Sequence, residues 1–72
     1  MKVTHEDHRA IEQIALANYE QDGNDYIVET LDLEGLQELA DIYECTDFDS
    51  LLTATQAWAK MVSEVESDIR GA

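Results

Sequence analysis

Apolar residues in the last third of the chain follow one regular pattern. From Phe48 onward they recur at alternating spacings of three and four residues, with Thr55 as the polar member of the series. This is the spacing of the a and d positions of a coiled coil, and it predicts one long helix that begins at Thr46 or Asp47. We call the series the C-terminal seam, and it comprises Phe48, Leu51, Thr55, Trp58, Val62, Val65 and Ile69.

A first helix is predicted near the N-terminus. Thr4 is followed three residues later by Asp7, a pattern typical of a capping box. The helix is expected to run to about Gln21, with Gly23 as its C-terminal stop. The residues expected to face inward recur at helical spacing and are Ala10, Ile11, Ile14 and Ala15, with Asn18 after them.

Residues 25–31 fit either a short helix or a strand. Several of them have high strand propensity, but a single strand would leave its backbone groups without partners. We therefore favour a short helix capped by Asn24 or Asp25, and the strand stays open as the alternative. The inward face of this helix would comprise Tyr26, Ile27, Thr30 and Leu31.

A third helix is predicted over residues 33–44, with Asp32 as its N-cap. The chain has no proline and three glycines, so few residues interrupt its helices. Together these patterns predict an all-α fold: a small bundle of three to four helices with a long C-terminal helix, in one domain that spans residues 1–72. The inward face of the third helix would comprise Leu33, Leu36, Leu39, Ala40 and Tyr43.

The short length of the chain bears on its association. A domain of 72 residues buries only about 60% of the surface that its unfolded chain exposes, so its stability is marginal. We expect the long helix to lie across the bundle core, because the other helices need a surface to pack on. The far end of the C-terminal seam, around Val62, Val65 and Ile69, would then overhang and pair with a second copy of the chain.

The chain is strongly acidic, with a formal net charge of −13 at pH 7 and a sequence pI near 4.1. Its four basic residues are Lys2, Arg9, Lys60 and Arg70, so residues 10–59 contain no lysine or arginine. Such a field repels nucleic acid and anionic membranes and attracts basic protein surfaces. We therefore expect no direct binding to nucleic acid or membranes. The alternative is that the charge only keeps the protein soluble.

The residue types that carry catalysis or metal binding form no recognisable set in the sequence. His5 and His8 lie three residues apart beside carboxylates, but a structural zinc site normally needs four ligands. Cys45 is the single cysteine and is expected to be a small buried residue in a reducing cytosol. We predict no catalytic, cofactor-binding or metal-binding residues, and hence no enzyme. With neither a signal peptide nor a membrane span in the sequence, we expect a cytoplasmic protein.

Asp49-Ser50-Leu51 resembles the motif of acyl carrier proteins, in which the serine opens a helix and carries a phosphopantetheine arm. Ser50 would be that serine. The chain departs from the pattern because Phe48 precedes the motif without a glycine, and only residues 52–72 follow it, too few for the two further helices of that family. We therefore interpret Ser50 as a first-turn residue of the last helix.

Three acidic residues of the third helix share one face. Glu34, Glu38 and Asp41 are spaced four and three residues apart. They are expected to lie opposite the face of Leu36, Leu39 and Tyr43. Neighbours at this spacing lie about 5–6 Å apart, comparable to the separation of successive phosphates along a nucleic-acid strand. A groove built for DNA or RNA would pair its arginines and lysines with these carboxylates. The predicted partner-binding residues are Glu34, Glu38, Asp41, Glu29, Asp25 and Glu44.

In size, acidity and helicity the whole chain resembles small phage or mobile-element proteins that inhibit host defence, such as anti-CRISPR and antirestriction nucleic-acid mimics. The resemblance rests on composition, and it implies a stoichiometric inhibitor of a nucleic-acid-binding protein or complex in the host cytoplasm. The alternative is a homodimeric interaction module whose acidic surface only keeps it soluble. Five residues of the C-terminal seam would form either the contact of that module or part of the core, namely Leu51, Trp58, Val62, Val65 and Ile69.

Overall fold

The computed structural model describes residues 1–21 and 23–71, with side chains up to Ser67. The described residues form helices and contain no strand, so the predicted all-α bundle is confirmed. Residues 25–31 are mostly helical, and the strand alternative for them is wrong. In chain order the elements are α1 (His5–Ala17), α2 (Asn24–Glu29), α3 (Leu33–Ile42) and α4 (Phe48–Gly71).

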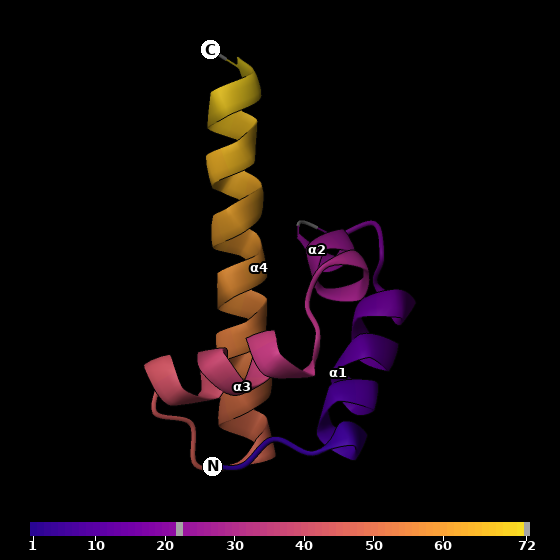
Figure 1. The fold of residues 1–72 in the computed structure, drawn as a ribbon. Helices are drawn as coiled ribbons and strands as arrows, with labels where there is room; N and C mark the ends of the chain where they lie inside the picture. Colours follow the sequence, from indigo (N-terminus) through magenta and orange to yellow (C-terminus); the bar gives the residue numbers. More distant parts are fainter. Residues whose placement is uncertain (22, 72) are drawn as a thin grey trace.

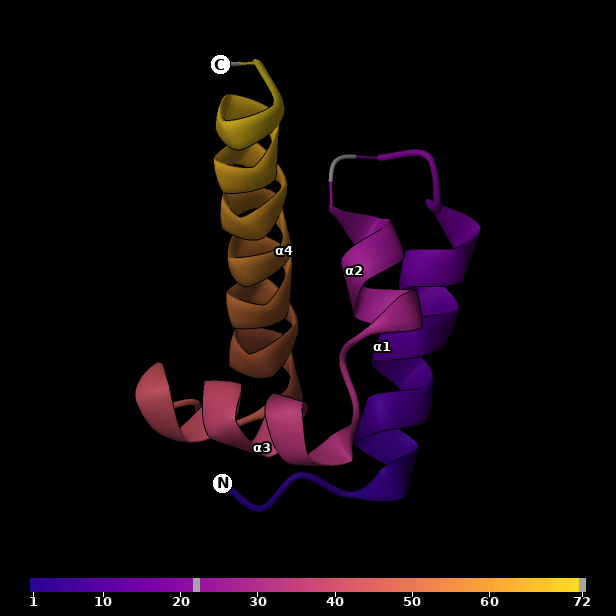
Figure 2. The same ribbon diagram turned by 45° about the horizontal axis from the view of Figure 1, so that its top comes forward.

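Helix α4 is the axis of the molecule (Figure 1). Its 24 residues correspond to about 36 Å of helix, close to the longest extent of the molecule, 38 Å. Both α2 and α3 contact α4, and α1 packs on α2 and α3. In Figures 1 and 2, α3 runs across the N-terminal part of α4, and the C-terminal turns of α4 extend beyond the other helices.

The predicted capping box starts α1. The Asp7 backbone N–H donates to Thr4 Oγ1 over 3.2 Å, and the Thr4 N–H donates to Asp7 Oδ2 over 3.1 Å. The predicted end of α1, at about Gln21, lies too far along the chain, because the helix stops at Ala17. The Asn18 amide donates to the Ile14 carbonyl over 3.1 Å and so satisfies an end group that a further turn of helix would otherwise bond.

Gly23 has a different role from the predicted stop of α1. It is the N-cap of α2, with a left-handed φ of 85°, and α2 lacks a side-chain cap, so the expectation of a cap from Asn24 or Asp25 is also wrong. A Cβ atom at this position would lie 2.2 Å from the carbonyl oxygen of Ala59 in α4. The start of α2 therefore touches the backbone of α4, and only glycine fits both the space and the φ angle.

Asp32 caps α3 as predicted, since its Oδ1 accepts a hydrogen bond of 2.8 Å from the Gly35 N–H. The helix ends at Ile42 rather than at residue 44. Tyr43 was predicted to face inward, but this C-cap residue is 45% exposed, because the chain turns away from the helical path there. The core side of α3 consists of the buried residues Leu36, Leu39 and Ala40, with Leu33 half-buried.

The C-terminal seam is buried near its start and becomes more exposed toward its end, where Val62 is half-buried. Leu51 and Thr55 are fully buried, and the Thr55 hydroxyl donates to the Leu51 carbonyl over 2.7 Å. Trp58 is partly buried and packs against the core, whereas Val65 is 53% exposed. The first half of the seam therefore crosses the bundle core, as predicted, and the second half does not. The Ile69 side chain lies outside the described residues.

Ser50 takes part in the start of α4. Its hydroxyl accepts hydrogen bonds of 3.1 Å from the N–H groups of Thr46 and Asp47, while its own N–H donates to Asp47 Oδ1 over 2.8 Å. The bond from the Ser50 N–H, and after it the Ser50 hydroxyl, holds the pKa of the Asp47 carboxyl below its ordinary value of 3.8. Ser50 is thus a first-turn residue that satisfies end groups of the helix, and α4 begins at Phe48, just after the predicted Thr46 or Asp47.

Candidate protein-binding surface

The three carboxylates predicted on one face of α3 are all exposed. Glu34, Glu38 and Asp41, which we call the acidic row, face solvent because the opposite side of the helix supplies Leu36 and Ala40 to the core. The row is anchored at one end. The Gln37 amide donates to Asp41 Oδ1 over 3.2 Å.

The N-terminal segment lies along α3 and holds Gln37 in place. Gln37 Nε2 donates to the Met1 carbonyl over 3.0 Å, and Gln37 Oε1 accepts from the Val3 N–H over 2.8 Å. Val3 is buried, and the Met1 ammonium donates to the carbonyl of buried Cys45 over 3.1 Å. Helix α3 is therefore held by the core on one side and by the N-terminal segment on another, and the acidic row projects from this fixed helix.

The other predicted partner-binding residues lie apart from the acidic row. Glu44 follows α3, is exposed and has a left-handed φ of 53°. Asp25 and Glu29 belong to α2, where Asp25 is half-buried. Glu29 accepts a hydrogen bond of 2.5 Å from the Tyr19 hydroxyl, and this bond raises the Tyr19 pKa above its ordinary value of 10.0. The structure thus brings together the α3 carboxylates and leaves the α2 carboxylates in a separate local network.

An apolar groove lies beside the acidic row, between α3 and α4. Its volume is about 330 Å³. Three of its residues are large and exposed: Ile42 by 72%, Met61 by 50% and Tyr43 by 45%. The residues that line it are Leu31, Gly35, Glu38, Leu39, Ile42, Tyr43, Trp58 and Met61.

Neither Ile42 nor Met61 was predicted from the sequence to be a surface residue. Both lie off the inward stripes of their helices, and that displacement is the signal that could have found them. The groove itself depends on the crossing of α3 and α4, which is visible in Figure 1. Both residues line the hollow between these helices. No pattern within one helix reveals such a feature.

The acidic row forms one edge of the apolar groove, because Glu38 belongs to both. At 100° per residue, the order around α3 runs from Asp41 through Glu34 and Glu38 to Ile42, and then to Leu39. Carboxylates and apolar side chains are therefore adjacent on one continuous surface. Such a surface can bind a partner that is both basic and apolar.

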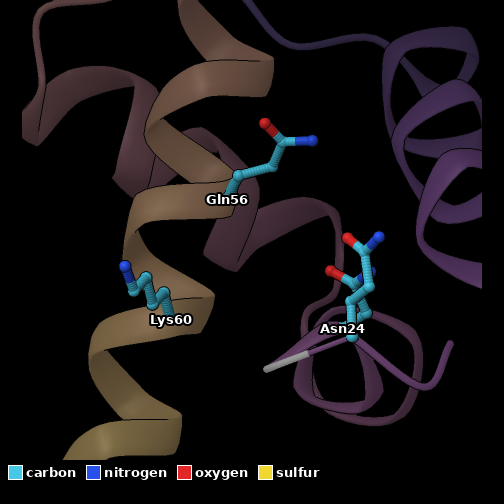
Figure 3. Close-up of a pocket in the computed structure, with 4 residues that line it drawn as sticks. Asn24, Gln56 and Lys60 are labelled. Atoms are coloured by element: carbon cyan, nitrogen blue, oxygen red, sulfur yellow. The ribbon is translucent and has the colours of Figure 1, made fainter. Parts of the chain in front are cut away.

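A second hollow, between α2 and α4, is polar (Figure 3). It has a volume of about 510 Å³ and is lined by Gln21, Asn24, Gln56 and Lys60. The Asn24 amide is already used, since it donates to the Asn18 carbonyl over 2.6 Å. Amides and one ammonium do not make an acid–base pair, so these four residues indicate no catalytic chemistry.

The histidines do not assemble a metal site within the part of the chain that is described. His8 Nε2 lies 3.0 Å from the Leu31 carbonyl, and His5 is exposed. Among the described residues, no three or more His, Cys, Asp or Glu side chains are grouped so as to hold a metal ion. Over the same residues, no helix combines the length and the apolar character needed to cross a membrane.

Comparisons with known proteins leave the surface itself as the basis for a functional proposal. No protein-family model, no curated protein and no solved structure matches the chain. The candidate site is therefore defined by its geometry, as a row of exposed carboxylates on α3 that borders an apolar groove between α3 and α4.

Proposed function

We propose that the protein is a non-enzymatic inhibitor that binds a basic, nucleic-acid-binding site of another protein through the acidic row. The observation that carries the proposal is the exposure of Glu34, Glu38 and Asp41 in one line on a packed helix. Their spacing of about 5–6 Å approximates that of phosphates on a strand. Arginine and lysine side chains pair with either group through charge-assisted hydrogen bonds.

The charge distribution supports the same proposal. Solubility is served equally well by interspersed charges, yet residues 10–59 include no lysine or arginine. An unbroken negative field attracts a basic surface from a distance and speeds association. The compositional resemblance to phage inhibitors extends the proposal to host defence complexes as the class of target.

A charge-neutralising variant tests the acidic row. The row variant combines Glu34→Gln, Glu38→Gln and Asp41→Asn, which keep the size of each side chain and replace one carboxylate oxygen by an NH2 group. Its matched control removes three exposed carboxylates elsewhere and so has the same net charge. That control combines Glu6→Gln, Glu20→Gln and Glu64→Gln.

Each protein is immobilised and exposed to a host lysate fraction already selected on DNA- or RNA-cellulose. We expect wild type and control to retain a protein at about 0.1 M salt and to release it at about 1 M, where the Debye length falls to about 3 Å. The row variant should not retain it, and duplex DNA or RNA should displace it from wild type. Equal retention by the row variant would contradict the proposal.

A second candidate function is supported by the exposed end of the C-terminal seam. Val65 of α4 is 53% exposed, although the neighbouring Glu66 accepts a hydrogen bond from Tyr26 of α2. The C-terminal turns of α4 extend beyond the other helices (Figures 1 and 2). A homodimeric interaction module would cover Val65 with a second copy. Sedimentation at micromolar concentration tests this candidate, because a seam-driven dimer persists or tightens at high salt. A strict monomer at both salt concentrations removes it.

A further inference from the structure

The apolar groove differs from the ordinary exposure of single apolar residues. Isolated exposed apolar residues are common on protein surfaces, but here Ile42, Tyr43 and Met61 converge on one hollow beside Trp58. On α4 the apolar surface continues one turn further to Val65, four residues after Met61. Contiguous apolar surface of this kind, bordered by polar residues, is typical of a protein-binding site.

The form of the groove suits a helix better than a small ligand. Two crossing helices form its sides, and the buried residues that line it are Leu31 and Leu39, with Trp58 partly buried. A volume of about 330 Å³ is at the low end of small-molecule sites, which span roughly 300–1,000 Å³, and the exposed side chains leave it open along α4. An amphipathic helix binds such a groove through apolar residues spaced i, i+3 or i+4, and i+7.

The negative charge at the edge of the groove determines which charge a bound helix can carry. Glu38 lines the groove, Glu34 lies one turn before it, and Asp41 lies one turn after it. A helix with acidic flanks would bring like charges together at this edge. A second copy of the chain would do the same, since each copy carries a net charge of −13.

We propose that the apolar groove binds a basic amphipathic helix of the partner protein. Apolar side chains of that helix enter the groove against Trp58, Ile42 and Met61, while its flanking lysines and arginines pair with the acidic row. The inference rests on the proposed function of the row and adds the apolar half of the same contact. The row supplies attraction and orientation, and the groove supplies the burial that holds the complex together.

A displayed library of helical peptides tests the inference. The peptides are randomised at the apolar positions and at the flanking positions, and the library is selected on the wild-type protein. We expect binders with apolar residues at i, i+3 or i+4, and i+7, and with lysine or arginine on the flanks. Trp58 is the single tryptophan of the chain, so its fluorescence reports binding of a selected peptide that lacks tryptophan.

Point variants then assign the contacts of the selected peptide. Ile42→Gln and Met61→Gln change residues that are at least half exposed, and Leu16→Gln, at a residue 45% exposed on α1, is the matched control. We expect each groove variant to weaken binding at least about tenfold, equivalent to about 1.4 kcal/mol, and the control to bind as wild type does. The row variant should weaken binding mainly at low salt.

The outcomes separate the two proposals. If the row variant loses binding while the groove variants keep it, the inference is overturned and the proposed function stands. If selected peptides carry no excess of lysine or arginine and the row variant binds them normally, the proposed function fails together with the basic character of the helix. Selection of no helical peptide, or a dimer that the groove variants dissociate, overturns the inference in favour of another occupant.

Discussion

Replacing Gly23 by alanine adds one carbon atom, Cβ, at the contact between α2 and α4. The added Cβ would lie 2.2 Å from the Ala59 carbonyl oxygen and 2.4 Å from its carbonyl carbon. Both are backbone atoms of a helix, so α2 has to move away from α4. Residue 23 also has a φ of 85°, which costs an L-residue about 1–2 kcal/mol.

The displacement of α2 adds to the cost of the left-handed conformation. Overpacking of a well-packed interface typically costs about 1–3 kcal/mol, and α2 contributes buried Ile27 to the core. We therefore expect Gly23→Ala to lose about 2–5 kcal/mol in total. A domain of this size rarely has more than about 3–5 kcal/mol of stability, so the variant should be largely unfolded or close to it.

Urea unfolding followed by far-ultraviolet circular dichroism measures this loss. Gly35→Ala is the matched control, because its Cβ would meet side-chain atoms at 3.0 and 3.2 Å and alanine favours a helix interior. We expect that control to stay within about 1 kcal/mol of wild type. If Gly23→Ala unfolds at the same urea concentration as wild type, the close approach of α2 to α4 is refuted.

Three further predictions concern the core, the acidic row and the start of α4. Trp58→Ala should cost about 2–3 kcal/mol in urea unfolding, less than the roughly 3–5 kcal/mol of a fully buried aromatic residue, because Trp58 is only partly buried. An unchanged unfolding midpoint would exclude its placement against the core. Neutralising Glu34, Glu38 and Asp41 together should leave the free energy of unfolding at low salt unchanged or raise it by up to about 0.5 kcal/mol. Relief of repulsion between like charges three or four residues apart offsets the loss of Glu34 from the first turn of α3. A loss above about 1 kcal/mol would show that the row stabilises the fold. The Asp47 pKa is lowered by its hydrogen bonds from Ser50, so its contribution to stability is present above pH 3.8 and is lost as the pH falls through the lower folded value. Carboxyl chemical shifts followed by NMR should give that lowered pKa. Ser50→Ala keeps the backbone N–H bond and removes the hydroxyl, so it should raise the pKa only part of the way to the ordinary value, and a full return to that value would contradict the main role of the backbone bond.

Local signals in the sequence predicted the elements whose causes are themselves local. The capping pair Thr4 and Asp7 and the N-cap Asp32 satisfy backbone groups within three residues, so their spacing alone reveals them. The role of Gly23 is not local. The same glycine fits the stop of a preceding helix or a close approach to another element, and only the position of Ala59 decides between them.

The candidate site divides in the same way. Exposure of the acidic row follows from its position opposite Leu36, because one helix face determines the other. The apolar groove requires Ile42 and Met61 to meet across two helices that are distant in sequence. The exposed end of the C-terminal seam likewise depends on how far α2 and α3 extend along α4 (Figure 2). Periodicity predicts which residues share a face but not how far a neighbouring helix extends over it.

Salt should act in opposite directions on the free protein and on its complex, if one surface combines the acidic row with the apolar groove. Residues 10–59 contain many carboxylates but no lysine or arginine. In the free protein, salt screens the repulsion among these carboxylates, so the stability of the fold rises with salt concentration. In the complex, salt weakens the attraction between the row and a basic helix, while burial of Ile42 and Met61 persists. A partner present at about 100 times its Kd raises apparent stability by about 2.7 kcal/mol, so thermal unfolding with and without a selected peptide measures both effects. The stabilisation by the peptide should shrink with salt but not vanish, because the apolar contact remains. Its complete loss at high salt would mean that the row binds alone, and no loss at all would mean that the groove does.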